Sequence, residues 1–445
     1  MSSLLVFTRD LRLDDNPALC AAAADGPMHC LFVKDEAILN SPTTSQRRQA
    51  FLDQCLEDIS RSLTERGAKL DLVYGDWFET VQRTIRDLKV DSVHIADDYS
   101  QYAQTRLQRL QDWCNDVGVS FHRHPGITVV PPGHLQPSGG GEYKVFTPYW
   151  RSWLKSSKRD IVTPPRSFND SALSSPPAES NLYPELSSEI IGGETHGWLR
   201  LHDWLQNGIT SYEKDRDTPS VEGTSLLSPY LRFGCISPLR LVELCTHLPD
   251  SEPFVRQVVW RDFYAQILAA RPDCSRSDYR DRGDIWNYDQ NSFQSWVDGL
   301  TGFPLVDAGM RQLRSQGLMH NRVRMVTASF LIKDLHQDWR LGANYFMSQL
   351  LDGDVASNYL NWQWVAGTGT DSNPHRILNP STQAKRFDGH AAYIRQWIPE
   401  LSSLDKADSL DPSPLLREKV GYPLPIVDHH ESVELFKERR LTSVD

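Results

Sequence analysis

One stretch of the chain, DGDVASNYLNWQWVAGTGTD, contains the residue types best suited to chemistry. It places two carboxylates (Asp352, Asp354), an amide (Asn358) and two tryptophans (Trp362, Trp364) within a short distance along the chain. An indole N–H needs a hydrogen-bond partner, so two tryptophans interleaved with Asn and Asp favour a site that holds a large flat ring. A Trp-rich helix packed in a large core, with Asp and Asn as caps, accounts for the same residues equally well.

A second stretch, GTSLLS, has the composition of a phosphate-binding loop. Gly223, Thr224, Ser225 and Ser228 precede a segment with helical character. Hydroxyls and free backbone N–H groups at a helix start form a natural cradle for phosphate. Taken alone the signal is weak, because most Ser- and Thr-rich helix starts are simple N-caps.

The formal net charge of −11 does not by itself indicate nucleic-acid binding. An acidic enzyme can still bind DNA if its basic residues gather at one site. For any single basic residue, solvated surface charge is the alternative. The candidates are Lys144, Arg151, Arg216, Arg261, Arg322, Arg324, Lys385 and Arg386.

These groups must be positioned by regular elements. Short apolar segments over residues 4–8, 28–33, 69–74 and 92–96 predict strands, and longer segments with helical spacing separate them. The alternation predicts an α/β domain with a doubly wound parallel sheet, whose ligands lie beyond the carboxyl ends of the strands. No G-x-G-x-x-G follows the first strand, so we expect no dinucleotide site there.

The composition changes in the middle of the chain. From Thr163 to Leu186 the sequence is rich in Pro, Ser and Asn, which predicts a connector. After Gly193 no strand pattern follows, so the second half is expected to be all-helical. The helices are predicted over 196–206, 238–247, 253–270, 303–315, 319–335 and 341–349. The expected domains are an α/β domain (1–130), a connector (131–195) and a helical domain (196–445).

Length and composition exclude other classes. No apolar run approaches the roughly 18 residues of a membrane span, and the N-terminus lacks the features of a signal peptide. The seven cysteines are scattered without a C-x-x-C pair. This pattern favours a reducing, cytoplasmic environment and predicts neither a disulfide framework nor a metal site.

Further motifs carry a family resemblance. HNRVRMVTASFLIKD begins at His320, QDWR contains Trp339, VFTRDLRLDDNPAL lies near the N-terminus, and YIRQWIPEL surrounds Trp397. Together with the Asp352 stretch, these segments resemble the cryptochrome/photolyase family, and among its members most closely the class I cyclobutane pyrimidine dimer (CPD) photolyases. The resemblance covers almost the whole chain. It implies the two-domain architecture described above and light-driven DNA repair by reduced FAD.

By this resemblance the pyrophosphate and ribityl region of FAD is bound by Tyr212, Thr224, Ser225, Leu226, Leu227 and Ser228. Asp352, Asp354 and Asn358 face the isoalloxazine ring, and Arg324 pairs with Asp352. Two carboxylates this close repel each other unless a cation or a donor is near. Asn358 is a neutral amide beside flavin N5, where plant cryptochromes typically have Asp and animal ones Cys. It therefore favours repair over signalling.

Three tryptophans match the family's electron relay from the surface to the flavin, namely Trp362, Trp339 and Trp286. Core packing remains the alternative for any one of them. A pyrimidine dimer must be flipped out of the stacked duplex to reach a cofactor. The resemblance assigns Trp260 and Trp364 as the aromatic walls of the lesion pocket. Its remaining DNA-contacting residues are Asn321, Met325, Arg216, Arg261, Arg322 and Arg324.

One position departs from the family pattern. Class I CPD photolyases have Glu three residues before the pocket tryptophan, where this chain has Gln257. A glutamine donates a hydrogen bond to the pyrimidine but cannot transfer a proton, and it is a feature of (6-4) photolyases. Asn321 and Met325 stand where (6-4) enzymes carry His, which favours the CPD substrate.

The resemblance leaves three further points open. A second, light-harvesting pigment, either 8-hydroxy-5-deazaflavin or a reduced folate, would contact residues 32–38 and 97–106, although these loops contain no clear pigment motif.

The rival functions are a cryptochrome photoreceptor and a (6-4) photolyase. Asn358 and the lack of a long C-terminal tail argue against the photoreceptor, and Gln257 supports the (6-4) photolyase. A dark flavoprotein oxidoreductase would need a nicotinamide site, which the sequence does not contain. The expected partner is damaged DNA, bound by a monomer.

Overall fold

The computed structural model describes residues 2–168, 190–370, 373 and 375–442. The connector was predicted from Thr163 to Leu186, and its residues 169–186 lie outside the described residues. Contacts divide the chain into two compact units. Unit 1 comprises residues 1–210, 225–273 and 351–356, and unit 2 comprises 211–224, 274–350 and 357–445.

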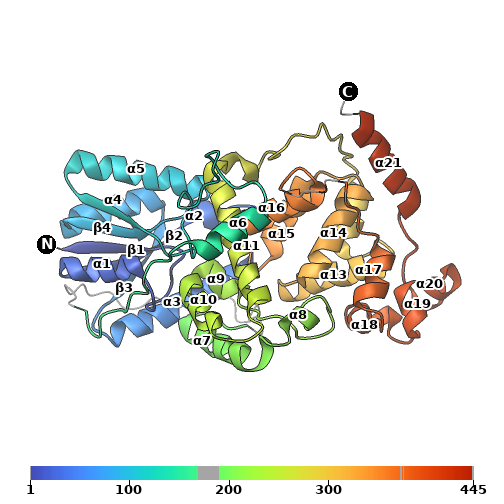
Figure 1. Ribbon diagram of the computed structural model, residues 1–445, viewed down its shortest axis with the longest axis horizontal. Coiled ribbons are helices and arrows are strands. Elements are labelled where there is room, and N and C mark those ends of the chain that lie inside the picture. The colour runs from blue at the N-terminus through green and yellow to red at the C-terminus, as the bar shows by residue number, and fades with distance from the viewer. Residues whose placement is uncertain (1, 169–189, 371–372, 374, 443–445) are drawn as a thin grey trace. The chain divides into compact units, whose positions relative to one another are not determined.

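A parallel sheet forms the N-terminal part of unit 1 (Figure 1). Among the described residues its strand order is β3-β2-β1-β4-β5. The strands are β1 (Ser3–Phe7), β2 (Met28–Asp35), β3 (Leu70–Gly75), β4 (Ser92–Ala96) and β5 (Ser120–His124). The four predicted strands and the doubly wound topology are confirmed, with the switch point between β1 and β4. Strand β5 was not predicted, because this half-exposed edge strand has the sequence SFHRH and therefore lacks an apolar run.

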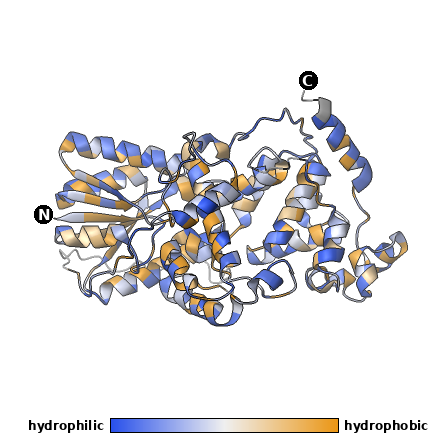
Figure 2. Cartoon of the chain, viewed as in Figure 1, coloured by the Kyte–Doolittle hydropathy of each residue, from blue (hydrophilic) through white to orange (hydrophobic). Residues whose placement is uncertain are grey.

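Helices cover both faces of this sheet. The helices are α1 (Pro17–Asp25), α2 (Glu36–Leu39), α3 (Gln46–Thr64), α4 (Trp77–Leu88) and α5 (Gln101–Val117). Alternate strand residues such as Val6, Leu31 and Ile95 pack in one core with Val81 of α4 and Leu107 of α5. Figure 2 shows the hydrophobic colours concentrated in the strands and on parts of the helices around them.

The rest of unit 1 is helical. Its elements are α6 (Phe146–Lys155), α7 (Glu194–Asp203), a π-helical turn (Trp204–Gly208), α9 (Ser228–Phe233), α10 (Pro238–Thr246) and α11 (Glu252–Ala270). The predicted helices over 196–206, 238–247 and 253–270 are confirmed by α7 with its π turn, α10 and α11. Pro begins α10 and Ser237 caps it by accepting from Arg240 N–H, so the sequence marks this helix start.

Unit 2 is a bundle of helices without a strand element in its described residues. The helices of this bundle are α8 (Tyr212–Asp215), α12 (Gln290–Asp298), α13 (Pro304–Gln316), α14 (Asn321–Lys333), α15 (Trp339–Gln349), α17 (Pro380–Phe387), α18 (Ala392–Trp397), α19 (Lys406–Leu410), α20 (Pro414–Val420) and α21 (His429–Thr442). The predicted helices over 303–315, 319–335 and 341–349 are confirmed by α13, α14 and α15. Helix α16 (Val355–Ala366) carries most of the Trp-rich stretch. Among the described residues, no helix is both long and apolar enough to span a membrane.

Candidate active site

The small-polar loop before α9 is held in a defined conformation within unit 1. Leu226 adopts a positive φ of 53°, and Leu227 N–H donates to Ser225 Oγ at 3.3 Å. Ser228 Oγ donates to Asp352 Oδ2 at 2.7 Å. The structure therefore brings the predicted phosphate loop and the first of the two carboxylates together.

The second carboxylate has a cationic partner that the sequence analysis did not identify. Arg9 donates to Asp354 and, at 3.4 Å, forms an ion pair with Asp98. Burial lowers the pKa of Arg9, but the charges of Asp98 and Asp354 outweigh this effect and raise it overall. One carboxylate thus binds a hydroxyl and the other a guanidinium, which reduces the repulsion expected between Asp352 and Asp354.

Half-buried arginines gather around this pair. Arg232 donates to Gly353 O at 2.7 Å, and burial, followed by the charge of Arg9, lowers the pKa of Arg232 to about 9. Arg261 donates to Leu231 O at 3.2 Å, and burial lowers its pKa too. A narrow cavity of about 20 Å³ lies against Arg9, Arg261 and Asp354. The three guanidinium groups are matched in number by the carboxylates of Asp98, Asp352 and Asp354, so the charges of this group balance.

Unit 2 holds the other predicted cofactor residues. The Arg216 guanidinium lies 5.7 Å from the Tyr212 ring centroid, and burial raises the pKa of Tyr212. A Cβ at Gly223 would lie 2.7 Å from Asp215 Cβ, so the loop requires glycine there. Arg324 Nε donates to Met319 O at 2.8 Å. The predicted Arg324–Asp352 pair joins residues of different units and stays a prediction.

Helix α16 positions Asn358 and Trp362 one turn apart. Asn358 is 8% exposed, and its Nδ2 donates to Ala343 O of α15 at 3.0 Å. Trp362 is 3% exposed and meets Phe346 edge-on, with ring centroids 5.0 Å apart. A Cβ at Gly342 would lie 2.2 Å from Trp362 Cη2, so this glycine makes room for the indole. Residues four apart lie on the same face of a helix, so Asn358 and Trp362 face the same way.

The three predicted relay tryptophans differ in burial. Trp362 and Trp339 are buried, whereas Trp286 is half-buried. The backbone at Asn287 forms a bridge to Gln337, so Trp286 is held beside the start of α15, where Trp339 lies. The last member of the predicted relay is therefore the most exposed of the three.

Trp339 has a carboxylate partner that sequence spacing did not indicate. Its Nε1 donates to Asp278 at 2.8 Å, and Arg340 Nη2 donates to the same oxygen at 2.8 Å. Burial raises the pKa of Asp278, although the bond from Trp339 and the charge of Arg340 oppose this. A carboxylate in contact with an indole N–H stabilises positive charge on that indole.

The predicted lesion wall Trp260 belongs to α11 in unit 1 and forms part of an aromatic stack. Phe146 covers one face of its ring, with centroids 3.8 Å apart and planes at 5°. Phe263 meets it edge-on at 5.4 Å. Gln257, one turn earlier on α11, is exposed. The sequence analysis missed Phe146, for which the aromatic-rich segment KVFTPYW was the only signal.

Asp262 secures the segments that support this stack. It accepts from Val129 N–H at 3.0 Å, from Val130 N–H at 2.9 Å and from Trp153 Nε1 at 3.0 Å. Burial raises the pKa of Asp262 to about 6, although these hydrogen bonds oppose the shift. Because Phe146 and Trp153 both belong to α6, this carboxylate helps to fix the helix that carries Phe146.

Of the remaining predicted DNA-contacting residues, Arg261 belongs to α11 in unit 1, whereas the others lie in unit 2. Asn321 is exposed at the start of α14, and Met325 follows one turn later, half-buried. Arg322 pairs with Asp217 at 2.8 Å. The Arg376 guanidinium lies 5.2 Å from the ring centroid of Trp364, which is half-buried. Polar, basic and aromatic side chains are thus accessible on this unit.

His320 caps the helix that carries Asn321. Its Nδ1 accepts from Arg322 N–H at 3.2 Å, which requires an unprotonated nitrogen. Burial, opposed by the charge of Asp217, lowers the pKa of His320 to about 4. The cap is therefore formed by the neutral ring at neutral pH.

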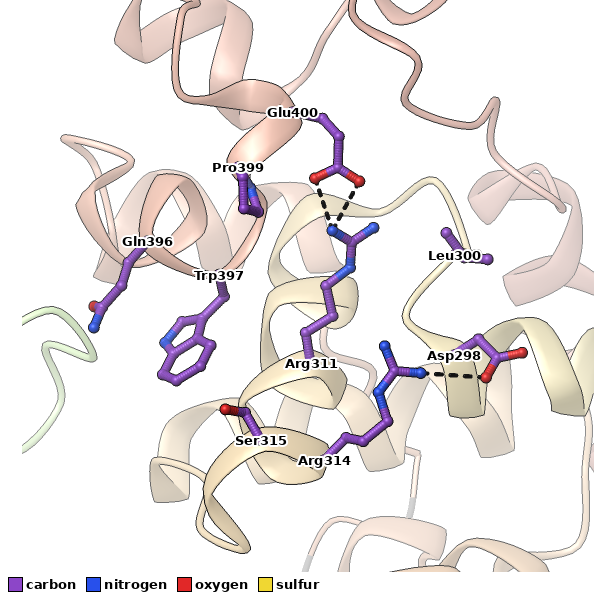
Figure 3. Close-up of a pocket in the computed structure, with 9 residues that line it drawn as sticks. All are labelled: Asp298, Leu300, Arg311, Arg314, Ser315, Gln396, Trp397, Pro399 and Glu400. Carbon is purple, nitrogen blue, oxygen red and sulfur yellow. Dashed lines mark hydrogen bonds and ion pairs between the residues drawn. The ribbon is translucent and has the colours of Figure 1, made fainter. Parts of the chain in front are cut away.

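A large open depression in unit 2 is distinct from all these residues (Figure 3). Its volume is about 730 Å³. Its two arginines already have partners, since Arg311 binds both oxygens of Glu400 at 2.8 and 2.9 Å and Arg314 lies 3.4 Å from Asp298. None of the predicted site residues lines it. We therefore do not assign it to the candidate active site.

Comparison with known proteins accounts for this combination of residues. Deoxyribodipyrimidine photo-lyase of Streptomyces griseus is 42% identical, over 98% of this chain and 99% of that protein. The chain belongs to the DNA photolyase family. A family model described as DNA photolyase matches residues 3–167, and one described as the FAD binding domain of DNA photolyase matches residues 254–441.

Solved photolyase structures have the same fold. A bacterial class III photolyase from Agrobacterium tumefaciens has a TM-score of 0.92 at 34% identity and covers 100% of this chain and 98% of its own. An archaeal photolyase from Sulfolobus tokodaii, crystallised with two FAD molecules, has a TM-score of 0.87 at 30% identity. That match covers 99% of this chain and 100% of the archaeal one.

The FAD-binding domain of the photolyase family makes FAD the cofactor of this chain. The residues present fit this group. Hydroxyls and N–H groups of the loop Ser225–Ser228 suit a pyrophosphate, and the neutral, buried amide of Asn358 suits a flavin ring edge. The family match thus supports the flavin reading of the Trp-rich stretch over core packing alone.

Proposed function

We propose that this photolyase repairs cyclobutane pyrimidine dimers in DNA in a light-driven reaction. The observation that carries the proposal is the arrangement of α16, where buried Asn358 and Trp362 share a face and half-buried Trp364 follows. One helix thus bears an amide for the flavin, an electron donor and a wall for the lesion. The 42% identity to a deoxyribodipyrimidine photo-lyase supports the same reading.

FAD, when bound, would supply the photochemistry: absorption of near-UV or blue light by its reduced form and loan of one electron to the dimer, which would return once the cyclobutane ring is split. The chain provides the positions and charges. We assign Tyr212, Thr224, Ser225, Leu226, Leu227 and Ser228 to the pyrophosphate and ribityl region. We assign Arg324, Asp352, Asp354 and Asn358 to the isoalloxazine.

In the proposed relay, Trp286, Trp339 and Trp362 would pass electrons from a reductant in solution to oxidised, photoexcited flavin. Trp362 is the inner donor, and half-buried Trp286 is the outer member. Asp278 supports this order, since a carboxylate bound to the Trp339 N–H stabilises the positive charge that passes through that ring.

The lesion pocket is assigned on the family resemblance. Trp260 and Trp364 stack on the flipped bases, which is worth about 1–3 kcal/mol per base. Gln257 donates a hydrogen bond to the pyrimidine and, unlike a carboxylic acid, cannot transfer a proton to it. The assigned pocket and DNA-backbone contacts are Asn321, Met325, Arg216, Arg261, Arg322 and Arg324.

A (6-4) photolyase is the second candidate, favoured by the glutamine at position 257. An assay on both lesions decides between the two functions. Reduced protein is illuminated with blue light without oxygen, in the presence of oligothymidine containing CPDs or an oligonucleotide with a (6-4) lesion. We expect the thymine absorbance to recover on the CPD strand alone. Recovery only on the (6-4) strand would replace the proposal, and recovery on neither, with normal flavin photoreduction, would favour a photoreceptor.

The remaining proposals concern organisation and partners. We place the α/β domain at 1–130, the connector at 131–195 and the helical domain at 196–445, with damaged DNA bound by a monomer.

A light-harvesting pigment, a deazaflavin or a reduced folate, would contact residues 32–38 and 97–106. In that region Tyr102 Oη donates to Asp35 at 2.6 Å and the Arg106 guanidinium lies 4.5 Å from the Trp77 ring centroid, so aromatic and polar groups are both present. Seven free thiols support a cytoplasmic location.

A further inference from the structure

Three histidines of the N-terminal sheet lie on the same face, which is the face covered by α1. His94 of β4 pairs directly with His122 of β5, and His124 follows two residues later on the same strand. Residues directly opposite each other and residues two apart on a strand point to the same side of a sheet. The ring centroids of His94 and His122 are 4.9 Å apart, and those of His94 and His124 are 5.2 Å apart.

A carboxylate completes this cluster. Asp25 is the last residue of α1, and its Oδ2 lies 2.9 Å from His94 Nε2. One ligand atom from each of Asp25, His94 and His122 lies within 4.8 Å of the other two. A tetrahedral ion with Zn–N and Zn–O bonds of about 2.0–2.2 Å holds its ligand atoms about 3.3–3.6 Å apart, so the exposed Asp25 and His122 side chains must rotate to close the site.

Neighbouring side chains orient these ligand atoms. His94 Nδ1 lies 3.0 Å from His124 Nε2, and Ser92 Oγ donates to Asp25 Oδ2 at 2.8 Å. With Nδ1–H donating to His124, the lone pair of His94 Nε2 points toward the Asp25 carboxylate. Metal-binding histidines typically donate their second ring N–H in this way, which sets the tautomer and the ring orientation.

We infer that Asp25, His94 and His122 form a binding site for one divalent transition-metal ion of the zinc class. Imidazole nitrogens with a single carboxylate suit Zn²⁺ better than Ca²⁺ or Mg²⁺, which prefer oxygen ligands alone. Three protein ligands leave a fourth position for water. The cysteine pattern, from which the sequence analysis expected no metal, does not bear on a site built from His and Asp.

The location of this site indicates a structural role. Ligands of doubly wound sheets bind beyond the carboxyl ends of the strands. Asp25 instead accepts a hydrogen bond from Ser92, the first residue of β4, and so lies at the opposite end of the sheet. An ion held there joins α1, β4 and the edge strand β5, whose sequence SFHRH provides little apolar area to hold it in place.

Zinc titration of the full chain, purified without a histidine tag and stripped with a chelator, tests the site. We expect calorimetry to show one tightly bound equivalent of Zn²⁺, which also raises the thermal unfolding midpoint. His122→Gln and Asp25→Asn should each weaken binding at least tenfold and remove the thermal shift. His124→Ala, which leaves the three ligands in place, should weaken binding by about 10–100-fold.

His134→Gln is the matched control, because His134 is exposed in a loop and should leave zinc binding unchanged. Far-UV circular dichroism of each metal-free variant checks that the fold is intact. His122 is itself exposed on an edge strand, so its replacement should not unfold the chain. Absence of a tight equivalent in the wild-type protein, or equal affinity in the wild type and the His122 and Asp25 variants, would overturn the inference.

Discussion

Phe146 lies flat against one face of Trp260, with ring centroids 3.8 Å apart and planes 5° from parallel. The two residues come from α6 and α11, which are far apart in the sequence. The stack fixes the plane of the half-buried indole before any ligand arrives. A base that stacks on it therefore loses less free energy to the ordering of the side chain.

Trp260→Ala should weaken binding to CPD-containing DNA by about 1–3 kcal/mol, roughly 5–150-fold, because the stacking surface is lost. Phe146→Ala should weaken it less, since the indole remains but is no longer held in one plane. Fluorescence anisotropy with a labelled oligonucleotide measures both. Leu154→Ala, at an exposed position of the same α6, is the control and should bind normally. Unchanged affinity of Trp260→Ala would place the lesion pocket elsewhere.

Trp362→Phe should abolish photoreduction of oxidised FAD, yet leave repair by chemically reduced enzyme largely intact. Phenylalanine keeps most of the packing against Phe346 but is far harder to oxidise than indole. Absorbance of the oxidised flavin under blue light, with an external reductant, measures the first effect. Trp296→Phe is a demanding control, because Trp296 is also fully buried and its ring lies 6.2 Å from that of Trp362. Loss of photoreduction in the Trp296 variant alone would show that the relay follows a different route.

The regular elements of this chain could be predicted because apolar spacing determines them. The strands that begin near residues 3, 28 and 92 are apolar runs buried on both faces, and a sequence pattern detects such runs well. The edge strand that begins at residue 70 is only partly buried, but its apolar residues Leu70, Leu72 and Val73 still give a strand pattern. The edge strand Ser120–His124 could not be found in this way. One face of this strand carries His122 and His124 and the other Phe121 and Arg123, so Phe121 alone packs against the core.

The candidate site was predicted only in part, because resemblance identifies residues that match a motif but not their partners. Arg9 binds Asp354, although the two residues are 345 positions apart. Asp278 and Trp339 are 61 positions apart. Ionic and hydrogen-bonded contacts of this kind depend on how the helices pack, and no local spacing encodes them. The motifs therefore indicated the type of chemistry. The tertiary structure was needed to find the charged groups, Arg9 and Asp278, that contact the motif residues.

Gln257→Glu should raise the yield of CPD repair per absorbed photon. A carboxyl group at this exposed position, one turn from Trp260, can give both a hydrogen bond and a proton to the reduced pyrimidine. Gln257→Met, similar in size but without a donor, should lower the yield. The quantum yield of thymine recovery under calibrated illumination measures both variants. A lower yield with Glu than with Gln would mean that the pocket is adapted to an amide.

The His320 cap should make unit 2 sensitive to acid. Its pKa is about 4 in the folded chain, against the ordinary value of 6.5. A histidine whose pKa is depressed by folding contributes its full stability above pH 6.5, and this contribution is lost as the pH falls toward 4. The difference corresponds to about 3 kcal/mol of unfolding free energy. His320→Asn replaces the ring by a good N-cap that does not titrate, so stability should depend less on pH in this range.

Urea unfolding at pH 7 and pH 4.5, followed by tryptophan fluorescence, compares the wild type with this variant. His134→Asn, at an exposed loop position, serves as the control and should show the acid dependence of the wild type. Asn321 and Arg322 lie in the first turn of the helix that His320 caps, so binding of damaged DNA by the wild type should weaken over the same pH range. If His320→Asn loses as much stability between pH 7 and pH 4.5 as the wild type does, His320 is not the titrating group.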